Sequence, residues 1–217
     1  MEKFVVAIDG PAGSGKSSIS KIVADTLNFT RINTGAMYRA IALEAQKRNI
    51  DLTDESKYDF LDDITVVYDN GVTKVNGEPV DNEALKGASK AASECSKLKR
   101  VRDRMLTFQR NSAIGKVLMD GRDIGTVVFP DADVKIYLDA SAEERAKRRY
   151  LEIKGTPIEK PYDEILKEIN DRDYEDKHRP IAPLKQADDA ILIDTTSLTI
   201  DEVVNKIISL INEKLRG

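Results

Sequence analysis

The fold is decided by residues 4–18, FVVAIDGPAGSGKSS. The first part, FVVAI, is a short apolar run rich in β-branched residues, which is typical of a strand buried on both faces in a parallel sheet. Residues 10–17 then match the pattern G-x-x-x-x-G-K-[ST], and apolar residues follow at helical spacing up to Leu27. The chain therefore opens with a strand, a glycine-rich loop and a helix, as expected of a phosphate-binding loop in an α/β fold.

The glycines let the loop curl so that successive N–H groups point at phosphate oxygens, and the next helix adds the positive end of its dipole. We expect Lys16 to reach the β- and γ-phosphates and the Ser17 hydroxyl to join the shell of a Mg²⁺ ion. The alternative is a glycine-rich turn without a ligand. We assign nucleoside triphosphate binding to Gly10, Pro11, Ala12, Gly13, Ser14, Gly15, Lys16, Ser17 and Ser18. This pattern does not say what is done with the nucleotide.

Strand and helix patterns alternate along most of the chain, which favours a parallel sheet covered on both faces. Further strands are predicted at residues 117–119, 134–138 and 190–193. Further helices are predicted at residues 36–48 and after two capping boxes, Ser141 with Glu144 and Thr199 with Glu202.

Two segments depart from this alternation. Residues 64–68 and 72–76 are β-branched runs on either side of Asp69-Asn70-Gly71, which predicts an inserted β-hairpin, and residues 83–113 are helical in composition. Between Tyr150 and Tyr162, the turn-forming residues Gly155, Pro157 and Pro161 mark a loop between two helices that is long enough to be a mobile lid.

Composition excludes several classes of protein. The 217 residues carry 34 Lys and Arg against 38 Asp and Glu, a net charge of −4, which argues against a general nucleic-acid or anionic-membrane binder. The single cysteine, Cys95, excludes an internal disulfide and suits a reducing compartment. No leader pattern and no apolar run of about 18 residues is present, so we expect a cytoplasmic protein without a membrane span.

Arginines point to a second anion site, although the chain is acidic overall. Guanidinium groups bind phosphate bidentately and keep their charge, so they can hold two polyanions against their mutual repulsion. For any one arginine, a solvated surface position is the simpler interpretation. The arginines at element ends or loop edges are Arg39, Arg102, Arg122, Arg145, Arg148, Arg149, Arg172 and Arg179.

Five segments resemble the cytidylate kinases of bacterial type, a family of nucleoside monophosphate kinases: residues 8–18, 33–40, 91–102, 120–149 and 172–184. The string DGRDIGTVVFPDA is long and specific. The resemblance implies a three-layer α/β P-loop kinase with a central parallel five-stranded sheet, an inserted monophosphate-binding domain and a lid. The implied core is residues 1–31 and 114–217, the insertion about 32–113 with its hairpin at about 62–80, and the lid about 150–165.

The resemblance also implies roles for single residues. Thr34 and Arg39 would touch the monophosphate with Tyr38 beside them, although Tyr38 is equally well explained by packing. Ser93, Arg102 and Asp123 would read cytosine, and Arg122 would lie at the acceptor phosphate. The remaining contacts with the pentose and the phosphates would come from Arg172, Asp176 and Arg179.

The implied reaction is ATP + CMP → ADP + CDP, with dCMP as a further acceptor, in a monomer that needs Mg²⁺. The acceptor oxygen is already ionised, so no general base is required and charge placement carries the catalysis. The catalytic candidates are Lys16, Arg122, Arg145, Arg149 and Arg172. Beside Ser17, Asp120 would hold a magnesium-bound water, the alternative being a turn cap, and Asp9 is expected to cap the phosphate loop. Asn33 and Ser18 stand where the family commonly has Asp and Thr.

Two other functions remain open at this point. Another P-loop kinase, acting on UMP, shikimate or a sugar acid, would share the loop and the lid but not the set Ser93, Arg102 and Asp123. A nucleotide-switch protein would need an N-K-x-D guanine reader after a strand, but the only Asn-Lys pair, Asn205-Lys206, lies inside the last predicted helix.

Overall fold

A parallel sheet of five strands forms the centre of the molecule, in the order β2-β6-β1-β7-β8. The computed structural model describes residues 3–69, 71–156 and 158–216. The sheet consists of β1 (Phe4–Asp9), β2 (Thr30–Asn33), β6 (Lys116–Asp120), β7 (Val134–Asp139) and β8 (Ile191–Asp194). The three-layer α/β fold with five parallel strands is thereby confirmed. Strand β2 had not been located from the sequence, because Ile32 is the only fully buried residue of its four.

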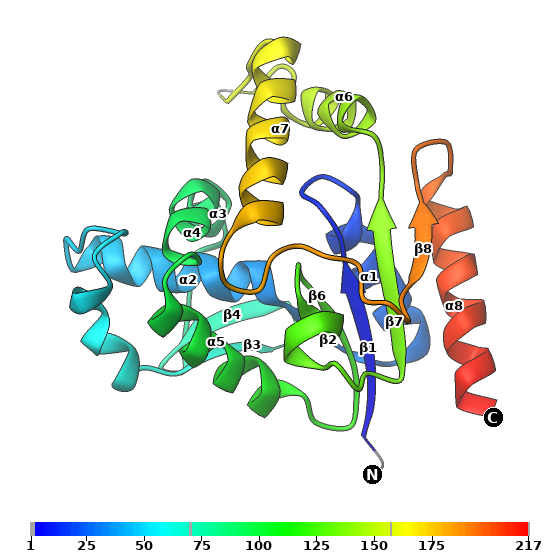
Figure 1. Cartoon of the computed structure of the whole chain (residues 1–217), viewed down its shortest axis with the longest axis horizontal. Helices are drawn as coiled ribbons and strands as arrows, with labels where there is room; N and C mark the ends of the chain where they lie inside the picture. Colours follow the sequence, from blue (N-terminus) through cyan, green and yellow to red (C-terminus); the bar gives the residue numbers. More distant parts are fainter. Residues whose placement is uncertain (1–2, 70, 157, 217) are drawn as a thin grey trace.

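Helices cover both faces of this sheet (Figure 1). On one face, α1 (Lys16–Leu27) and α8 (Ile200–Arg216) pack against Val6 and Ile8 of β1. On the other face, α2 (Thr34–Lys47) and α5 (Lys99–Ser112) pack against Val5 and Ala7. Successive residues of β1 thus serve opposite layers, which explains its uninterrupted apolar run.

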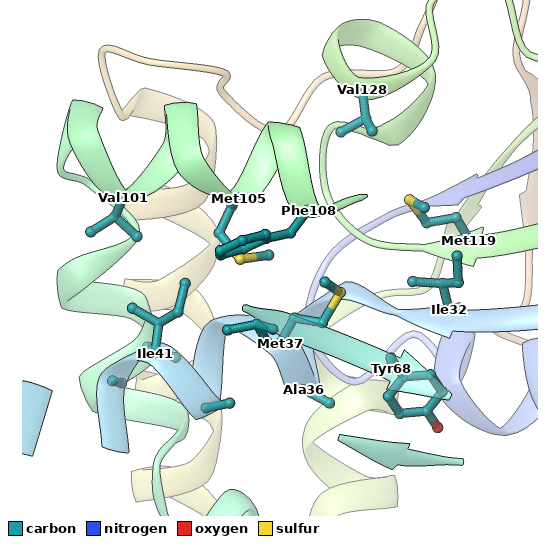
Figure 2. Packing of buried hydrophobic residues seen from close by; sticks show 14 of the residues in the cluster. Ile32, Ala36, Met37, Ile41, Tyr68, Val101, Met105, Phe108, Met119 and Val128 are labelled. Carbon is teal, nitrogen blue, oxygen red and sulfur yellow. The ribbon is translucent and has the colours of Figure 1, made fainter. Parts of the chain in front are cut away.

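The inserted segment shares the core of the sheet. Figure 2 shows Met37 of α2 and Met105 and Phe108 of α5 turned toward one another, with Ile32 and Met119 on the neighbouring strands β2 and β6. All five are buried in one cluster. The boundary expected at about residue 32 falls inside β2, which continues to Asn33.

The expected hairpin is present as β3 (Val66–Asp69) and β4 (Val72–Val75), and β5 (Glu78–Pro79) extends it to three antiparallel strands. Its central turn residue Asn70 lies outside the described residues. The helical stretch predicted at residues 83–113 consists of three separate helices. The other elements of the insertion are the short helix η1 (Glu55–Asp62), α3 (Asn82–Gly87) and α4 (Ser89–Cys95).

Two helices flank the segment expected to form a lid, α6 (Ala142–Ile153) and α7 (Tyr162–His178). Buried Ala146, Ile153 and Ile165 help to join them in a small apolar cluster of their own. Helical structure reaches into both ends of the lid segment expected at about 150–165, so the connection itself is residues 154–161, of which Pro157 lies outside the described residues. Figure 1 shows α6 and α7 at the end of the sheet toward which β1 and β7 point.

One of the two predicted capping boxes is complete: Thr199 and Glu202 bond to each other's backbone N–H groups. At the other, the Ser141 hydroxyl accepts from the N–H of Glu144 at 3.1 Å, but the N–H of Ser141 donates to Thr196 Oγ1 and the Glu144 carboxylate pairs with Arg148, so Ser141 is an N-cap without the reciprocal bond. No helix among the described residues is long and apolar enough to cross a membrane.

Candidate active site

A cleft of about 990 Å³ opens at the carboxyl ends of the parallel strands. Its walls come from the phosphate loop, the insertion, α6 and α7, which is the usual place for a ligand in an open α/β sheet. The expected site residues that line it are Ala12, Gly13, Gly15, Lys16, Ser17, Ser18, Thr34, Tyr38, Arg39, Ser93, Arg102, Asp120, Arg122, Asp123, Arg145, Arg149, Arg172, Asp176 and Arg179. The remaining three, Gly10, Pro11 and Ser14, do not line the cleft.

These three residues shape the phosphate loop. A Cβ at Gly10, where φ is +148°, would lie 2.0 Å from the carbonyl oxygen of Leu138, so only glycine fits between the two strands. Lys16 Nζ donates to the carbonyl of Pro11 at 2.5 Å and to Ser14 Oγ at 3.2 Å. Burial, followed by the charge of Arg122, lowers the pKa of Lys16 well below its ordinary value. A polyphosphate in the loop would reverse this shift, because opposite charge favours the ammonium form.

Guanidinium groups with unbonded N–H donors gather on the other side of the cleft. Arg39 Nε, Arg172 Nε and Arg179 Nη2 are buried and have no hydrogen-bond partner among the described residues. Burial, followed by the positive charge of Arg122, lowers the pKa of Arg172 to about 10. Buried donors without partners are costly, so this cluster is a site that an anion would stabilise.

Two of the expected cytosine readers form a buried ion pair. Arg102 Nη2 donates to Asp123 Oδ2 at 2.6 Å, and Arg102 Nη1 donates to the carbonyl of Ser96 at 3.0 Å. Arg102 and Asp123 are only 6% and 7% exposed. The Arg102 guanidinium also lies 5.8 Å from the ring centroid of Tyr38, and Ser93 lines the cleft from α4. A polar set with fixed geometry is what discrimination between bases requires.

Arg122, the residue before Asp123, connects the expected cytosine readers to α7 through an ion pair with Asp176. Its Nε donates to Asp176 Oδ2 at 3.0 Å, and Arg179 Nη1 lies 3.6 Å from the other oxygen of Asp176. Burial alone would raise the pKa of Asp176, but the charges of Arg122 and two neighbouring arginines hold it below its usual range. Asp176 thus orients arginines while it remains ionised.

The two catalytic candidates on α6, Arg145 and Arg149, differ from each other. Arg145 is 3% exposed, pairs with both oxygens of Asp173, and donates to the carbonyls of Ala12 and Ala140. Its contact with Ala12 ties α6 to the phosphate loop, so it holds the loop in place. Arg149 pairs with Glu152 on the half-exposed surface of α6 and lines the cleft.

Ser17 and Asp120 approach a common position, which the guanidinium of Arg31 fills. Arg31 Nη2 donates to Ser17 Oγ at 2.8 Å and Nε to Asp120 Oδ1 at 3.1 Å. A hydroxyl and a carboxylate that share one cationic group are oxygen donors of the kind Mg²⁺ prefers, so the residues fit a metal here. Burial raises the pKa of Asp120, and the charge of Arg31 is the largest influence against it.

Asp9 has a role other than the expected one. Its carboxylate accepts from the N–H groups of Ile124 and Gly125 at 2.8 and 2.7 Å, so it caps the short helix η2 (Ile124–Val128) after β6 and not the phosphate loop. Burial raises the pKa of Asp9 to about 6, despite these two hydrogen bonds.

A pH effect on stability follows. Because the pKa of Asp9 is higher in the folded chain than its ordinary 3.8, its contribution to the free energy of unfolding is full below about pH 4 and is lost as pH rises through 6. Asp9→Asn does not titrate. We expect urea unfolding between pH 4.5 and 7.5 to show the wild type losing on the order of 2 kcal/mol relative to this variant. Parallel pH profiles would contradict the account.

Arg31 is a residue of the site that the sequence did not predict, and Arg148 was predicted only as one of the arginines that point to an anion site. Arg148 donates to the carbonyl and the hydroxyl of Thr195 and lines the cleft. Arg31 is the second residue of the four-residue strand β2, which has no strand pattern in the sequence, so no local signal would have identified it.

The family model described as "Cytidylate kinase" matches residues 6–213. The chain is 47% identical to a cytidylate kinase of Caldicellulosiruptor saccharolyticus, covering 97% of this chain and 96% of that protein. It is 47% identical to one from Bacillus velezensis, with 99% of both chains covered. Among solved structures, an uncharacterized protein from Eubacterium ventriosum aligns with a TM-score of 0.53 at 14% identity, covering 97% of this chain and 99% of that one. That likeness supports the fold alone.

Proposed function

The chain belongs to the cytidylate kinase family, and from this we propose that it transfers the γ-phosphoryl group of ATP to CMP, giving ADP and CDP, with dCMP as a further acceptor. The observation that carries the proposal is one cleft in which a phosphate loop faces a cluster of arginines with unbonded N–H donors. Two polyanions, ATP and the monophosphate, can be held there end to end. The ion pair Arg102–Asp123 lines the same cleft as Arg39 and would read the base of the monophosphate. The direct test is the appearance of CDP and ADP in equal amounts from ATP and CMP. ADP without CDP would contradict the assignment.

The chain's own groups act by position and charge. The acceptor is an ionised phosphate oxygen, so no side chain has to remove a proton. Lys16 neutralises the β- and γ-phosphates, while Arg39, Arg122 and Arg172 orient the acceptor phosphate and offset its repulsion of ATP. Arg145 fixes the loop and Arg149 lies on the lid side of the cleft, from which it can approach the transferred group.

Magnesium is part of the proposal. Ser17 would ligate the ion directly and Asp120 through a water, and nucleotide phosphates would complete the shell, as is usual for this metal. When bound, Mg²⁺ neutralises charge that develops on the phosphoryl group. Among the described residues, no group of three or more His, Cys, Asp or Glu could hold a metal.

Further features belong to the same proposal. We expect a cytoplasmic monomer that binds neither nucleic acid nor membrane, in keeping with the net charge of −4 and with a single, buried Cys95. Burial raises the pKa of Cys95 to about 12, so this thiol is not a reactive nucleophile.

Arg39→Lys tests the acceptor site. A point ammonium cannot reproduce two parallel N–H···O bonds to a phosphate, so we expect KM for CMP to rise about tenfold or more while KM for ATP changes little. Arg48→Lys is the matched control, because Arg48 lies at the end of the same helix and pairs with Glu44 away from the cleft. Wild-type kinetics for Arg39→Lys would show that Arg39 is only a helix-surface residue.

A further inference from the structure

Arg31 is the residue at this site that neither the motifs nor the family resemblance explains. It lies in β2, its side chain is only 13% exposed, and its guanidinium meets three partners. Besides its bonds to Ser17 Oγ (2.8 Å) and Asp120 Oδ1 (3.1 Å), Nη1 donates to the hydroxyl of Tyr68 at 3.4 Å. The group therefore bridges the two side chains that we assign to the metal.

The Ser17 hydroxyl is saturated as an acceptor in this arrangement. It receives N–H groups from Arg31 at 2.8 Å and from the Asn33 side-chain amide at 3.2 Å, which uses both oxygen lone pairs. A metal ion can coordinate Ser17 Oγ only after one of these donors leaves. An aspartate at position 33 would lack the N–H that Asn33 donates, so the two residues act together on Ser17.

The position beside Asp120 can hold only one of two cations, the guanidinium of Arg31 or a divalent metal ion. Asp120 is only 5% exposed, and Arg31 Nε donates to its Oδ1 at 3.1 Å. A guanidinium and a divalent ion cannot share this carboxylate without strong repulsion. Tyr68 offers the guanidinium another place, because its ring centroid is 5.9 Å from Arg31 Cζ and its hydroxyl is already a partner.

We propose that Arg31 is a tethered cation that occupies the metal position between Ser17 and Asp120 and competes with Mg²⁺ for it. The inference rests on the proposed function, since it takes these two residues to be the metal site. A metal held there by Ser17 and Asp120 would neutralise charge on the phosphates of the donor, so a cation in its place would support binding of nucleotide that arrives without metal. When nucleotide arrives with Mg²⁺, Arg31 must leave Ser17 and Asp120.

The test compares nucleotide affinity with and without Mg²⁺, and with and without the Arg31 guanidinium. Calorimetry measures the affinity for a non-hydrolysable ATP analogue, with Mg²⁺ or with EDTA, in the wild type and in Arg31→Gln. We expect the variant to lose about tenfold in affinity for metal-free nucleotide, the loss of one charge-assisted contact, and to bind the magnesium complex as well as or better than the wild type. Arg100→Gln is the matched control, because Arg100 pairs with Asp59 and Asp62 outside the cleft, and both of its affinities should stay unchanged.

An equal loss in both conditions, or no loss in either, would overturn the proposal. Arg31→Lys provides a second variant that keeps the charge, and it should retain most of the metal-free affinity whether or not the glutamine variant folds well. Low metal-free affinity in a folded lysine variant would equally contradict a role for the charge. The readout is binding, so a chain that bound nucleotide but formed no CDP would refute the proposed function and leave this inference standing.

Discussion

Lys16→Ala is expected to lower kcat about a thousandfold, or ~4 kcal/mol in the transition state, and to leave CMP affinity within a few-fold of the wild type. Lys16 is 7% exposed and its ammonium lies inside the phosphate loop, bonded to Pro11 and Ser14. The positive charge of Lys16 stabilises the transition state more than the bound substrates, because negative charge builds up on the phosphoryl oxygens as the bond to the γ-phosphate breaks.

The measurement pairs steady-state kinetics with calorimetry of CMP binding. Lys21→Ala is the control, because Lys21 lies on the same helix, faces solvent and pairs only with Asp25. Lost CMP affinity with kcat intact would show that Lys16 serves the acceptor site.

Asp123→Ala is expected to lower kcat/KM for CMP by at least about tenfold, with little change in ATP binding. The ratio of kcat/KM for CMP to kcat/KM for UMP should also decrease. Cytosine offers an amino donor where uracil has a carbonyl, so a carboxylate favours the first and repels the second. Arg102 is held by Asp123 and by the Ser96 carbonyl, ready to donate to acceptors on the cytosine ring.

The ion pair complicates this variant, because removing Asp123 leaves Arg102 buried without its charge partner. Asp123→Asn therefore accompanies it, since the amide keeps the shape and can donate to the uracil carbonyl. Kinetics on both monophosphates are read together with melting curves. If both variants lose stability and activity toward the two bases alike, Asp123 is a structural ion-pair partner and not a base reader.

Local patterns in the sequence were enough to predict the core of the fold. The phosphate loop, the strands with continuous β-branched runs and the helix N-caps Ser141 and Thr199 depend on residues close together in the chain, and the structure has them all. Strand β2 has no such pattern, because its short edge position leaves only Ile32 fully buried. Without β2, Arg31 had no place in the predicted site.

Other features depend on partners distant in sequence. Arg145 was predicted as a catalytic candidate, and its pairing with Asp173, 28 positions away, and with the carbonyl of Ala12 could not be predicted from neighbouring residues. Asp9 was expected to cap its own loop, but its acceptors meet N–H groups 115 and 116 residues further on. Only the packing of the sheet brings these groups together. The roles assigned to single substrate contacts remain predictions.

The central claim is transfer to a cytosine monophosphate, and the acceptor profile tests it most directly. ADP formation from ATP is measured with CMP, dCMP, UMP, AMP, GMP, shikimate and gluconate as acceptors at equal concentration. We expect kcat/KM for CMP to exceed that for UMP by at least about tenfold and little ADP with the other acceptors apart from dCMP. Preferred phosphorylation of UMP, shikimate or gluconate, or ADP formation independent of any acceptor, would contradict the claim.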